Sequence, residues 1–170
     1  MKDVLRIEDL TKKFKKKNFF SSDSDEVIAA DSVNFSLEQG KILAIAGQSG
    51  SGKTTIAKLI LRAIKPDSGK IFHNQKEIMD NSDELKKFRM KCQMIYQDPY
   101  DSINPRMTIS DIVSEPLEIH NIGTKKEREQ RVIETLEKVK LEPAEEISKK
   151  YPHMLSGGQR QRIVIARAIV

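Results

Sequence analysis

The chain has 170 residues, enough for one domain with a hydrophobic core, and its formal net charge at pH 7 is +5. A hydrophobic content of 38% beside 32% charged residues is typical of a soluble globular protein. The longest apolar runs, such as 41–47, are too short to cross a bilayer, the N-terminal segment lacks the apolar stretch of a secretion signal, and one cysteine, Cys92, excludes an internal disulfide.

The first forty residues alternate between apolar and polar side chains, as strands with one buried face do. This alternation predicts a strand over 4–10 and a second strand over 27–37. The polar residues between them, 12–26, are expected to form a loop. Its basic run TKKFKKK, at 11–17, has an acidic counterpart at 21–26, so a solvated loop is favoured over contact with phosphate or acidic lipid.

The next segment joins an apolar run to a glycine-rich turn. Residues 41–47, KILAIAG, have the continuous apolar pattern of a buried strand. The stretch GQSGSGKTT at 47–55 follows directly, and the apolar spacing over 54–64 predicts a helix that Pro66 closes. A buried strand, then Gly-x-x-x-x-Gly-Lys-Thr, then a helix is the context of a P-loop.

The residue types of this loop suit a polyphosphate. Glycines let successive backbone N–H groups point at one anion, and a helix starting near Gly52 adds free N–H groups and its positive end. Lys53 supplies a charge for the β- and γ-phosphates, Thr54 supplies a hydroxyl to Mg²⁺, which prefers oxygen ligands, and Thr55 is expected near the α-phosphate. The predicted nucleoside triphosphate site comprises Gly47, Gln48, Ser49, Gly50, Ser51, Gly52, Lys53, Thr54 and Thr55.

The remainder of the chain is predicted to be mainly helical. Residues 70–78 have the pattern of an edge strand, 82–90 of a short helix and 92–97 of another short strand. From residue 107 onward the apolar spacing is that of helices, most clearly over 125–141. The apolar stripe of that segment is expected to be a packing face.

The last predicted helix opens with LSGGQRQR at 155–162. Ser156 stands where a helix N-cap belongs, and Gly157 and Gly158 leave backbone N–H groups uncovered, which makes a second candidate anion site. A serine-glycine turn that only caps a structural helix is the alternative. The presence of two such helix starts in one short chain favours the anion site.

Three motifs together, GQSGSGKT, LSGGQ and the glutamine of MIYQDP, resemble the ATP-binding-cassette (ABC) ATPase family along the whole chain. Segments 96–117 and 149–162 resemble more narrowly the subfamily that powers dipeptide, oligopeptide and nickel importers, although Met154 stands where that group more often has glutamate. The resemblance implies an α/β P-loop NTPase core with an antiparallel N-terminal part and an inserted α-helical subdomain. The implied division is 1–97 for the core, 98–155 for the helical subdomain and 156–170 for the signature helix.

The resemblance also implies roles for single residues. Gln97 matches the Q-loop glutamine, which touches Mg²⁺ and the attacking water. The implied catalytic residues are therefore Lys53 and Gln97. The implied Mg²⁺ contacts are Thr54 and Gln97. Phe14 stands at the position that stacks on adenine, with Phe19 and Phe20 as competitors, and packing of Phe14 on the core is the alternative. In the family, each ATP lies between one P-loop and the other cassette's signature, here Leu155, Ser156, Gly157, Gly158 and Gln159.

Some family elements have no counterpart in these 170 residues. They are a buried strand ending in Asp-Glu, which supplies the general base, and a later histidine that contacts the γ-phosphate. Asp98 also ends an apolar run, but its flanking residues match the Q-loop segment better. We therefore expect an incomplete cassette whose sheet exposes unpaired edges, with marginal stability and, on its own, incomplete catalysis.

The implied function is that of the ATP-hydrolysing subunit of an importer for peptides or similar small solutes. Such a subunit lies on the cytoplasmic face of the membrane as a peripheral protein, pairs with a second cassette, contacts transmembrane permease subunits and depends indirectly on a solute-binding protein, with no nucleic acid. A soluble ABC ATPase acting on DNA is disfavoured by the short interval 54–155, because the chromosome-structure type carries a long coiled-coil insertion there. One acting on the ribosome is disfavoured because that type has two cassettes in one chain, whereas this chain holds less than one. A nucleotide-binding remnant or regulatory partner without turnover is the third possibility.

Overall fold

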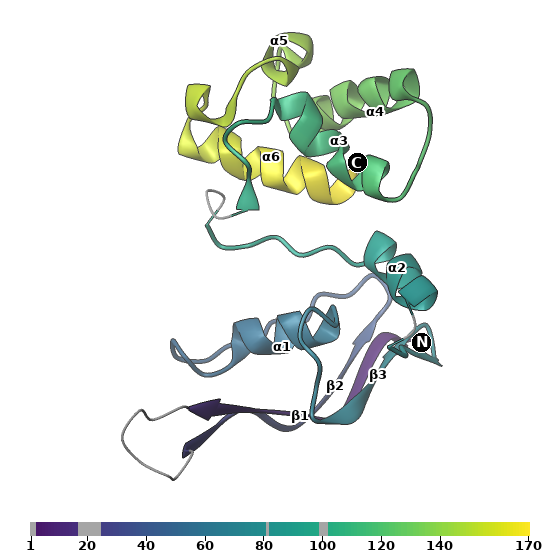
Figure 1. Cartoon of the computed structure of the whole chain (residues 1–170), viewed down its shortest axis with the longest axis vertical. Helices are drawn as coiled ribbons and strands as arrows, with labels where there is room; N and C mark the ends of the chain where they lie inside the picture. Colours follow the sequence, from purple (N-terminus) through teal and green to yellow (C-terminus); the bar gives the residue numbers. More distant parts are fainter. Residues whose placement is uncertain (1–2, 17–24, 81, 99–101) are drawn as a thin grey trace. The chain divides into compact units, whose positions relative to one another are not determined.

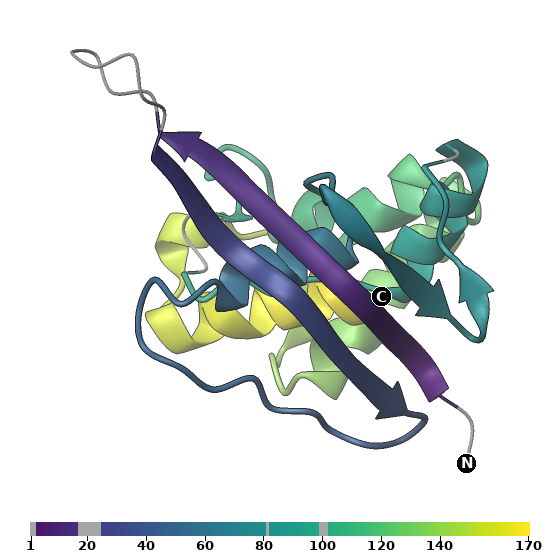
Figure 2. The same ribbon diagram turned by 90° about the horizontal axis from the view of Figure 1, so that it is seen from below.

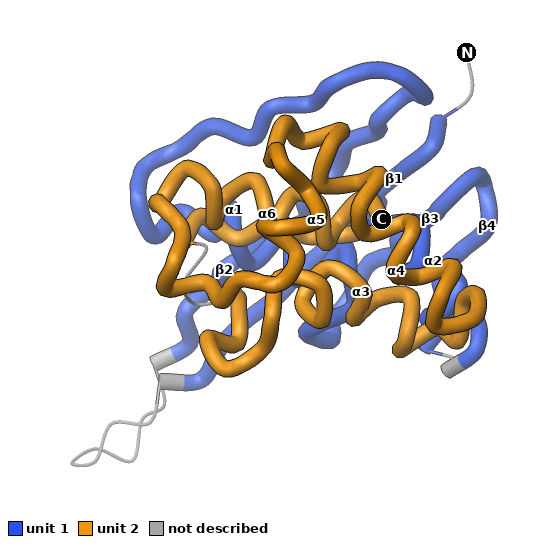
Figure 3. The backbone as a smooth tube through the Cα atoms, turned by 90° about the horizontal axis from the view of Figure 1, so that it is seen from above, with its two compact units in different colours: residues 1–92 blue, residues 93–170 orange. Residues whose placement is uncertain are grey.

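The computed structural model of the chain describes residues 3–16, 25–80, 82–98 and 102–170 (Figure 1). The chain divides into two compact units, and Figure 3 shows residues 1–92 in blue and 93–170 in orange. The contacts therefore place the division after Cys92, whereas the sequence analysis expects it after residue 97. Each unit is described by itself.

The first unit is built on a four-stranded antiparallel sheet in the order β2-β1-β3-β4 (Figure 2). The long strand β1 pairs with both β2 and β3. Between Ile7 and Leu10 the register slips by one residue against β2, which is a β-bulge. In a regular strand, residues three positions apart face opposite sides of the sheet. The extra residue turns Ile7 and Leu10 to the same side, and both are buried. The strands are β1 (Asp3–Lys16), β2 (Asp25–Glu38), β3 (Ser68–His73) and β4 (Lys76–Glu77).

Two helices complete the first unit, α1 (Lys53–Ile60) and α2 (Ser82–Lys91). Helix α1 turns Ile56 and Leu59 toward the sheet, and α2 contributes Phe88 to the same core. The predicted helix over 54–64 is shorter in the structure because Arg62 adopts a left-handed backbone conformation with φ 52°. The buried core of this unit is Ile7, Leu10, Ala30, Ile56, Leu59, Ile71, Ile78 and Phe88.

The predicted loop over 12–26 is wrong at both ends. β1 continues to Lys16 and β2 begins at Asp25, so Phe14 lies opposite Val27 in a paired ribbon. A two-stranded ribbon can be polar on both faces, because its ladder hydrogen bonds do not depend on burial. Phe19, Phe20 and most of the acidic run lie outside the described residues.

The predicted buried strand over 41–47 and the predicted short strand over 92–97 are also wrong. In the described part of the chain these segments have no strand partner, and Ile42 is 97% exposed. An apolar run expresses a preference for burial, but a strand forms only where a neighbour supplies hydrogen bonds.

The predicted edge strand over 70–78 is a hairpin made of β3 and β4. Asn74 and Gln75 turn the chain with positive φ of 49° and 68°, as both central residues of a two-residue type I′ turn do. The backbone N–H of Ile78 donates to the carbonyl of Ile71 at 2.8 Å, and its side chain returns to the core.

The second unit is helical and has its own core (Figure 1). The predicted helix over 125–141 is α4, which ends at Lys138, with Val132 and Leu136 fully buried. Within the described ranges, no helix combines the length and apolarity that a membrane crossing requires. The helices are α3 (Ile109–Ile119), α4 (Lys125–Lys138), α5 (Ala144–Ser148), the 3-10 turn η2 (Pro152–Met154) and α6 (Gly157–Ile169).

Candidate nucleotide-binding site

The glycine-rich loop leads into α1 as the P-loop pattern predicts. The backbone N–H of Ser51 donates to the carbonyl of Gln48 at 3.2 Å, and the N–H of Ile56 donates to the carbonyl of Gly52 at 2.9 Å. Within the described residues of α1, no side chain caps Gly52 and no acidic residue lies in the first turn. The N–H groups at this helix start therefore keep their capacity for an external anion.

Gly52 lies directly against strand β2. Its φ is 91°, and a β-carbon added to it would stand 2.0 Å from the carbonyl oxygen of Ala29. Only glycine tolerates both the backbone angle and this approach. The end of the loop is therefore fixed by the sheet beneath it.

Lys53 curls back over the loop that precedes it. Its Nζ donates to the carbonyl oxygens of Gly47, at 2.8 Å, and Gln48, at 2.5 Å, and lies 3.4 Å from the hydroxyl of Ser51. Among the described residues, no carboxylate forms an ion pair with it. The loop thus holds one ammonium that no carboxylate of the described residues compensates.

The two threonines follow in the first turn of α1. Thr54 is exposed and Thr55 is half-buried. Among the described residues, no group of three His, Cys, Asp or Glu side chains could enclose a metal ion. The exposed hydroxyl of Thr54 is an oxygen ligand of the kind that Mg²⁺ prefers.

Phe14 lies on β1 opposite Val27, and its side chain is 42% exposed. The ammonium of Lys12 stands 5.6 Å from the centre of its ring. The ring therefore offers an exposed aromatic surface and is not part of the buried core of the first unit.

The signature residues form the start of α6. Ser156 is its N-cap: the Ser156 Oγ accepts from the backbone N–H of Gln159 at 3.3 Å, and the Gln159 side chain accepts from the backbone N–H of Ser156 at 2.9 Å. A β-carbon added to Gly158 would meet nothing within 4 Å, so the space over this residue is open. Leu155 is 5% exposed and anchors the turn in the core of the second unit.

Comparison with known proteins decides the family. The ABC transporter family profile matches residues 30–170. The chain belongs to the ABC transporter family.

Its curated relatives include proteins described as peptide-transport subunits. The chain is 41% identical to the oligopeptide transport ATP-binding protein AppF of Bacillus subtilis over 98% of its own length and 51% of the relative's. It is 42% identical to the dipeptide transport ATP-binding protein DppF of Haemophilus influenzae, over 91% of its own length and 47% of the relative's. This ABC-family chain thus spans about half the length of the curated relatives it matches.

Solved structures confirm the predicted α/β fold of an ABC ATPase. An ATP-binding cassette described as a dimeric post-hydrolysis state bound to ADP and Pi superposes with a TM-score of 0.82 at 31% identity, over 97% of this chain and 68% of that one. The structure of cbiO1 from Clostridium perfringens superposes with a TM-score of 0.76 at 26% identity, over 99% of this chain and 62% of that one.

The structure of this ABC-family chain groups the predicted site residues in two places. The P-loop residues 47–55 and Phe14 belong to the first unit. Gln97 and Asp98, both exposed and outside any helix or strand, belong with the signature to the second unit. Each group is therefore defined within its own unit.

The sequence analysis did not predict the contacts of two arginines on α6. The Arg160 guanidinium donates to the carbonyls of Pro152 and Leu155 and so braces the turn before the signature. Arg167 donates to the carbonyl of Ser102 at 2.6 Å and pairs with Glu115 on α3 at 3.6 Å. Local spacing could have indicated Arg160, which lies five residues after Leu155, but no local signal could have indicated the contact between Arg167 and Ser102.

Proposed function

We propose that this chain supplies the nucleotide-binding half of an ATP-hydrolysing subunit that powers an ABC importer for peptides or similar small solutes. The observation that carries the proposal is the P-loop at 47–55, which presents an uncapped helix start and the uncompensated charge of Lys53. The printed names of the curated relatives support peptides as the solute class.

ATP fits this loop on physical grounds. The helix dipole of α1, its uncapped N–H groups and Lys53 all favour the triphosphate, and Phe14 offers an exposed ring for adenine. Mg²⁺ supplies charge neutralisation at the phosphates when bound, with Thr54 and Gln97 as its proposed protein contacts. Lys53 then binds the β- and γ-phosphates, and Gln97 orients the attacking water.

The proposed partners follow from two proposed phosphate sites, the P-loop and the signature. The signature, Leu155–Gln159, would bind the γ-phosphate of an ATP held by a second cassette, identical or different. Transmembrane permease subunits would contact the Q-loop and the helical part, residues 98–155, with a solute-binding protein acting through them. This subunit would lie as a peripheral protein on the cytoplasmic face of the membrane.

A thermal melt of the chain with and without Mg-ATP tests the proposal. Binding to the native state adds RT ln(1 + [L]/Kd), so ATP at about a thousand times its Kd should add about 4 kcal/mol and raise the melting temperature. Lys53→Ala should abolish this shift, because the ammonium that faces the phosphates is lost. Lys58→Ala, in the last turn of the same helix, is the matched control and should keep the shift. An equal ATP shift in the Lys53 variant would overturn the P-loop assignment.

A further inference from the structure

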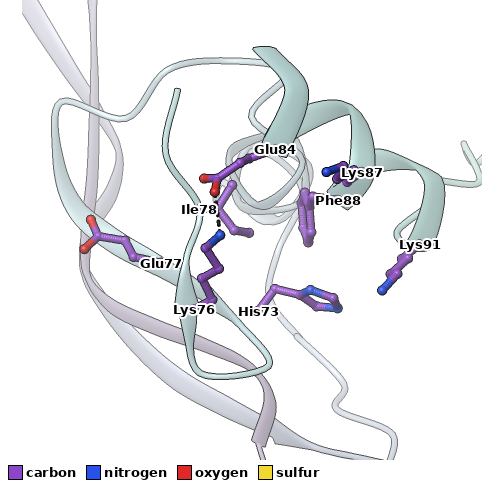
Figure 4. Close-up of a pocket in the computed structure, with 8 residues that line it drawn as sticks. All are labelled: His73, Lys76, Glu77, Ile78, Glu84, Lys87, Phe88 and Lys91. Carbon is purple, nitrogen blue, oxygen red and sulfur yellow. Dashed lines mark hydrogen bonds and ion pairs between the residues drawn. The ribbon is translucent and has the colours of Figure 1, made fainter. Parts of the chain in front are cut away.

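A cavity lies in the first unit, between the β3–β4 hairpin and helix α2 (Figure 4). Its volume is about 170 Å³, below the roughly 300–1,000 Å³ of sites for drug-sized ligands. Any ligand here must be small, on the scale of a single ring. None of the residues that line the cavity belongs to the predicted nucleotide site. The lining residues are His73, Lys76, Glu77, Ile78, Glu84, Lys87, Phe88 and Lys91.

The charges that line this cavity do not balance. Glu84 pairs with Lys76 at 2.5 Å, and Glu77 pairs with Lys70 at 3.6 Å, so both acids already have a cation. Lys87 and Lys91 form no ion pair with any described residue. They lie four residues apart on α2 and therefore on the same helix face. The cavity thus has two ammonium groups on one helix face that form no ion pair with the described part of the chain.

The floor of the cavity is apolar. Ile78 is 5% exposed and Phe88 is 4% exposed, and in Figure 4 the ring of Phe88 points from α2 toward His73. The ring of His73 stands edge-on to Phe88, with the ring centres 5.3 Å apart. Burial, with a smaller contribution from the charge of Lys91, lowers the pKa of His73. The Nε2 atom of its ring lies 3.3 Å from the side-chain amide nitrogen of Asn74.

We propose that this cavity binds a small organic carboxylate with an apolar body about the size of one ring. The carboxylate would lie between the ammonium groups of Lys87 and Lys91, and the body would pack on Phe88 and Ile78. A compact phosphate would satisfy the cations but gain no apolar contact with Phe88 and Ile78. A neutral ring would cover the floor but leave the two ammonium groups uncompensated, so the carboxylate with an apolar body satisfies both features.

Histidine ring signals in the NMR spectrum of the chain test this proposal directly. The sequence has three histidines, so His73 reports on the cavity while His120 and His153 in the second unit serve as internal controls. Benzoate should shift the His73 signal to saturation and leave the other two in place. Benzamide, which has the same shape without the charge, and acetate, which lacks the ring, should each bind more than tenfold more weakly, as should inorganic phosphate.

Charge removal on α2 gives the second part of the test. The double variant Lys87→Gln, Lys91→Gln should weaken benzoate binding more than tenfold, whereas Lys86→Gln on the same helix, outside the cavity lining, should not change it. Equal binding of benzoate and benzamide to the unmodified chain would overturn the proposal, as would a His73 signal that benzoate does not move. Tighter binding of inorganic phosphate than of benzoate would also overturn it, since it would assign the site to a bare anion.

Discussion

His73 shows how one side chain links stability to pH. The charged groups that line its cavity are Lys76, Lys87, Lys91, Glu77 and Glu84, and of these the ammonium of Lys91 opposes protonation of the imidazole. Burial is the larger cause of its lowered pKa, because the charged ring loses hydration in the folded chain.

The sign of this effect gives the first prediction. Because the folded pKa lies below the ordinary 6.5, the unfolded chain takes up the proton first as the pH falls. The contribution of His73 to the free energy of unfolding is therefore complete above pH 6.5 and is lost as the pH falls toward the folded pKa. NMR titration should give a His73 pKa below 6.5, and urea unfolding of His73→Gln should show a smaller loss of stability between pH 7 and pH 5.5. A His73 pKa at or above 6.5 would contradict it.

Helix starts are where sequence and structure agree best at the scale of single elements. Three helices of the second unit begin with a capping box: Thr108 with Asp111, Thr124 with Glu127, and Ser156 with Gln159. The first two use a carboxylate, and hydrogen bonds from Thr124 lower the pKa of Glu127. The signature helix closes the same box with a neutral amide, so it gains the cap without placing a negative charge where a phosphate would bind.

A charge swap tests this difference between the boxes. Gln159→Glu should preserve the box and leave α6 as stable or about 0.3–1 kcal/mol more stable, because a carboxylate suits the positive end of a helix. The same change should abolish ATP-dependent pairing with a complete family cassette, since the new charge repels the γ-phosphate. Size-exclusion chromatography with and without ATP measures the pairing, and thermal melts measure the stability.

Glu127→Gln is the matched control, because it alters the same box position on α4. It should leave pairing unchanged. Pairing that survives in Gln159→Glu would show that the signature does not face a phosphate.

The helix caps and the misplaced strand over 41–47 differ in how far apart in the chain the deciding residues lie. Each cap of α4 and α6 depends on two residues that are three positions apart in the sequence. Thr124 and Ser156 could therefore be predicted from the sequence as caps. The segment 41–47 depends on a neighbouring strand, and apolar composition does not reveal whether one is available. The same limit applies to the contact of Gly52 with Ala29, which joins residues far apart in the chain.

At the scale of the whole molecule, stability is divided between two cores. Leu59 is fully buried in the first unit and Leu136 is fully buried in the second, and each belongs to a separate hydrophobic cluster. Separate cores allow separate cooperative opening, so local stability is expected to differ between the two units.

Matched core variants make this a testable prediction. Leu59→Ala and Leu136→Ala should each cost about 2–5 kcal/mol through lost burial and the cavity left behind. Hydrogen exchange followed by mass spectrometry should show faster exchange only in the unit that carries the change: 3–92 for Leu59→Ala and 93–170 for Leu136→Ala. Equal acceleration throughout the chain in both variants would show that the two units open together.

The contact between Gly52 and β2 has a consequence for how this loop can evolve. The atom that excludes a side chain at position 52 is the carbonyl oxygen of Ala29, which every amino acid carries. No replacement at position 29 can therefore compensate for a larger residue at position 52. A genetic screen for suppressors of Gly52→Ala should recover none at position 29. A loss of ATP binding in the Gly52→Ala variant would have two causes, displacement of the loop from the sheet and a lost phosphate contact.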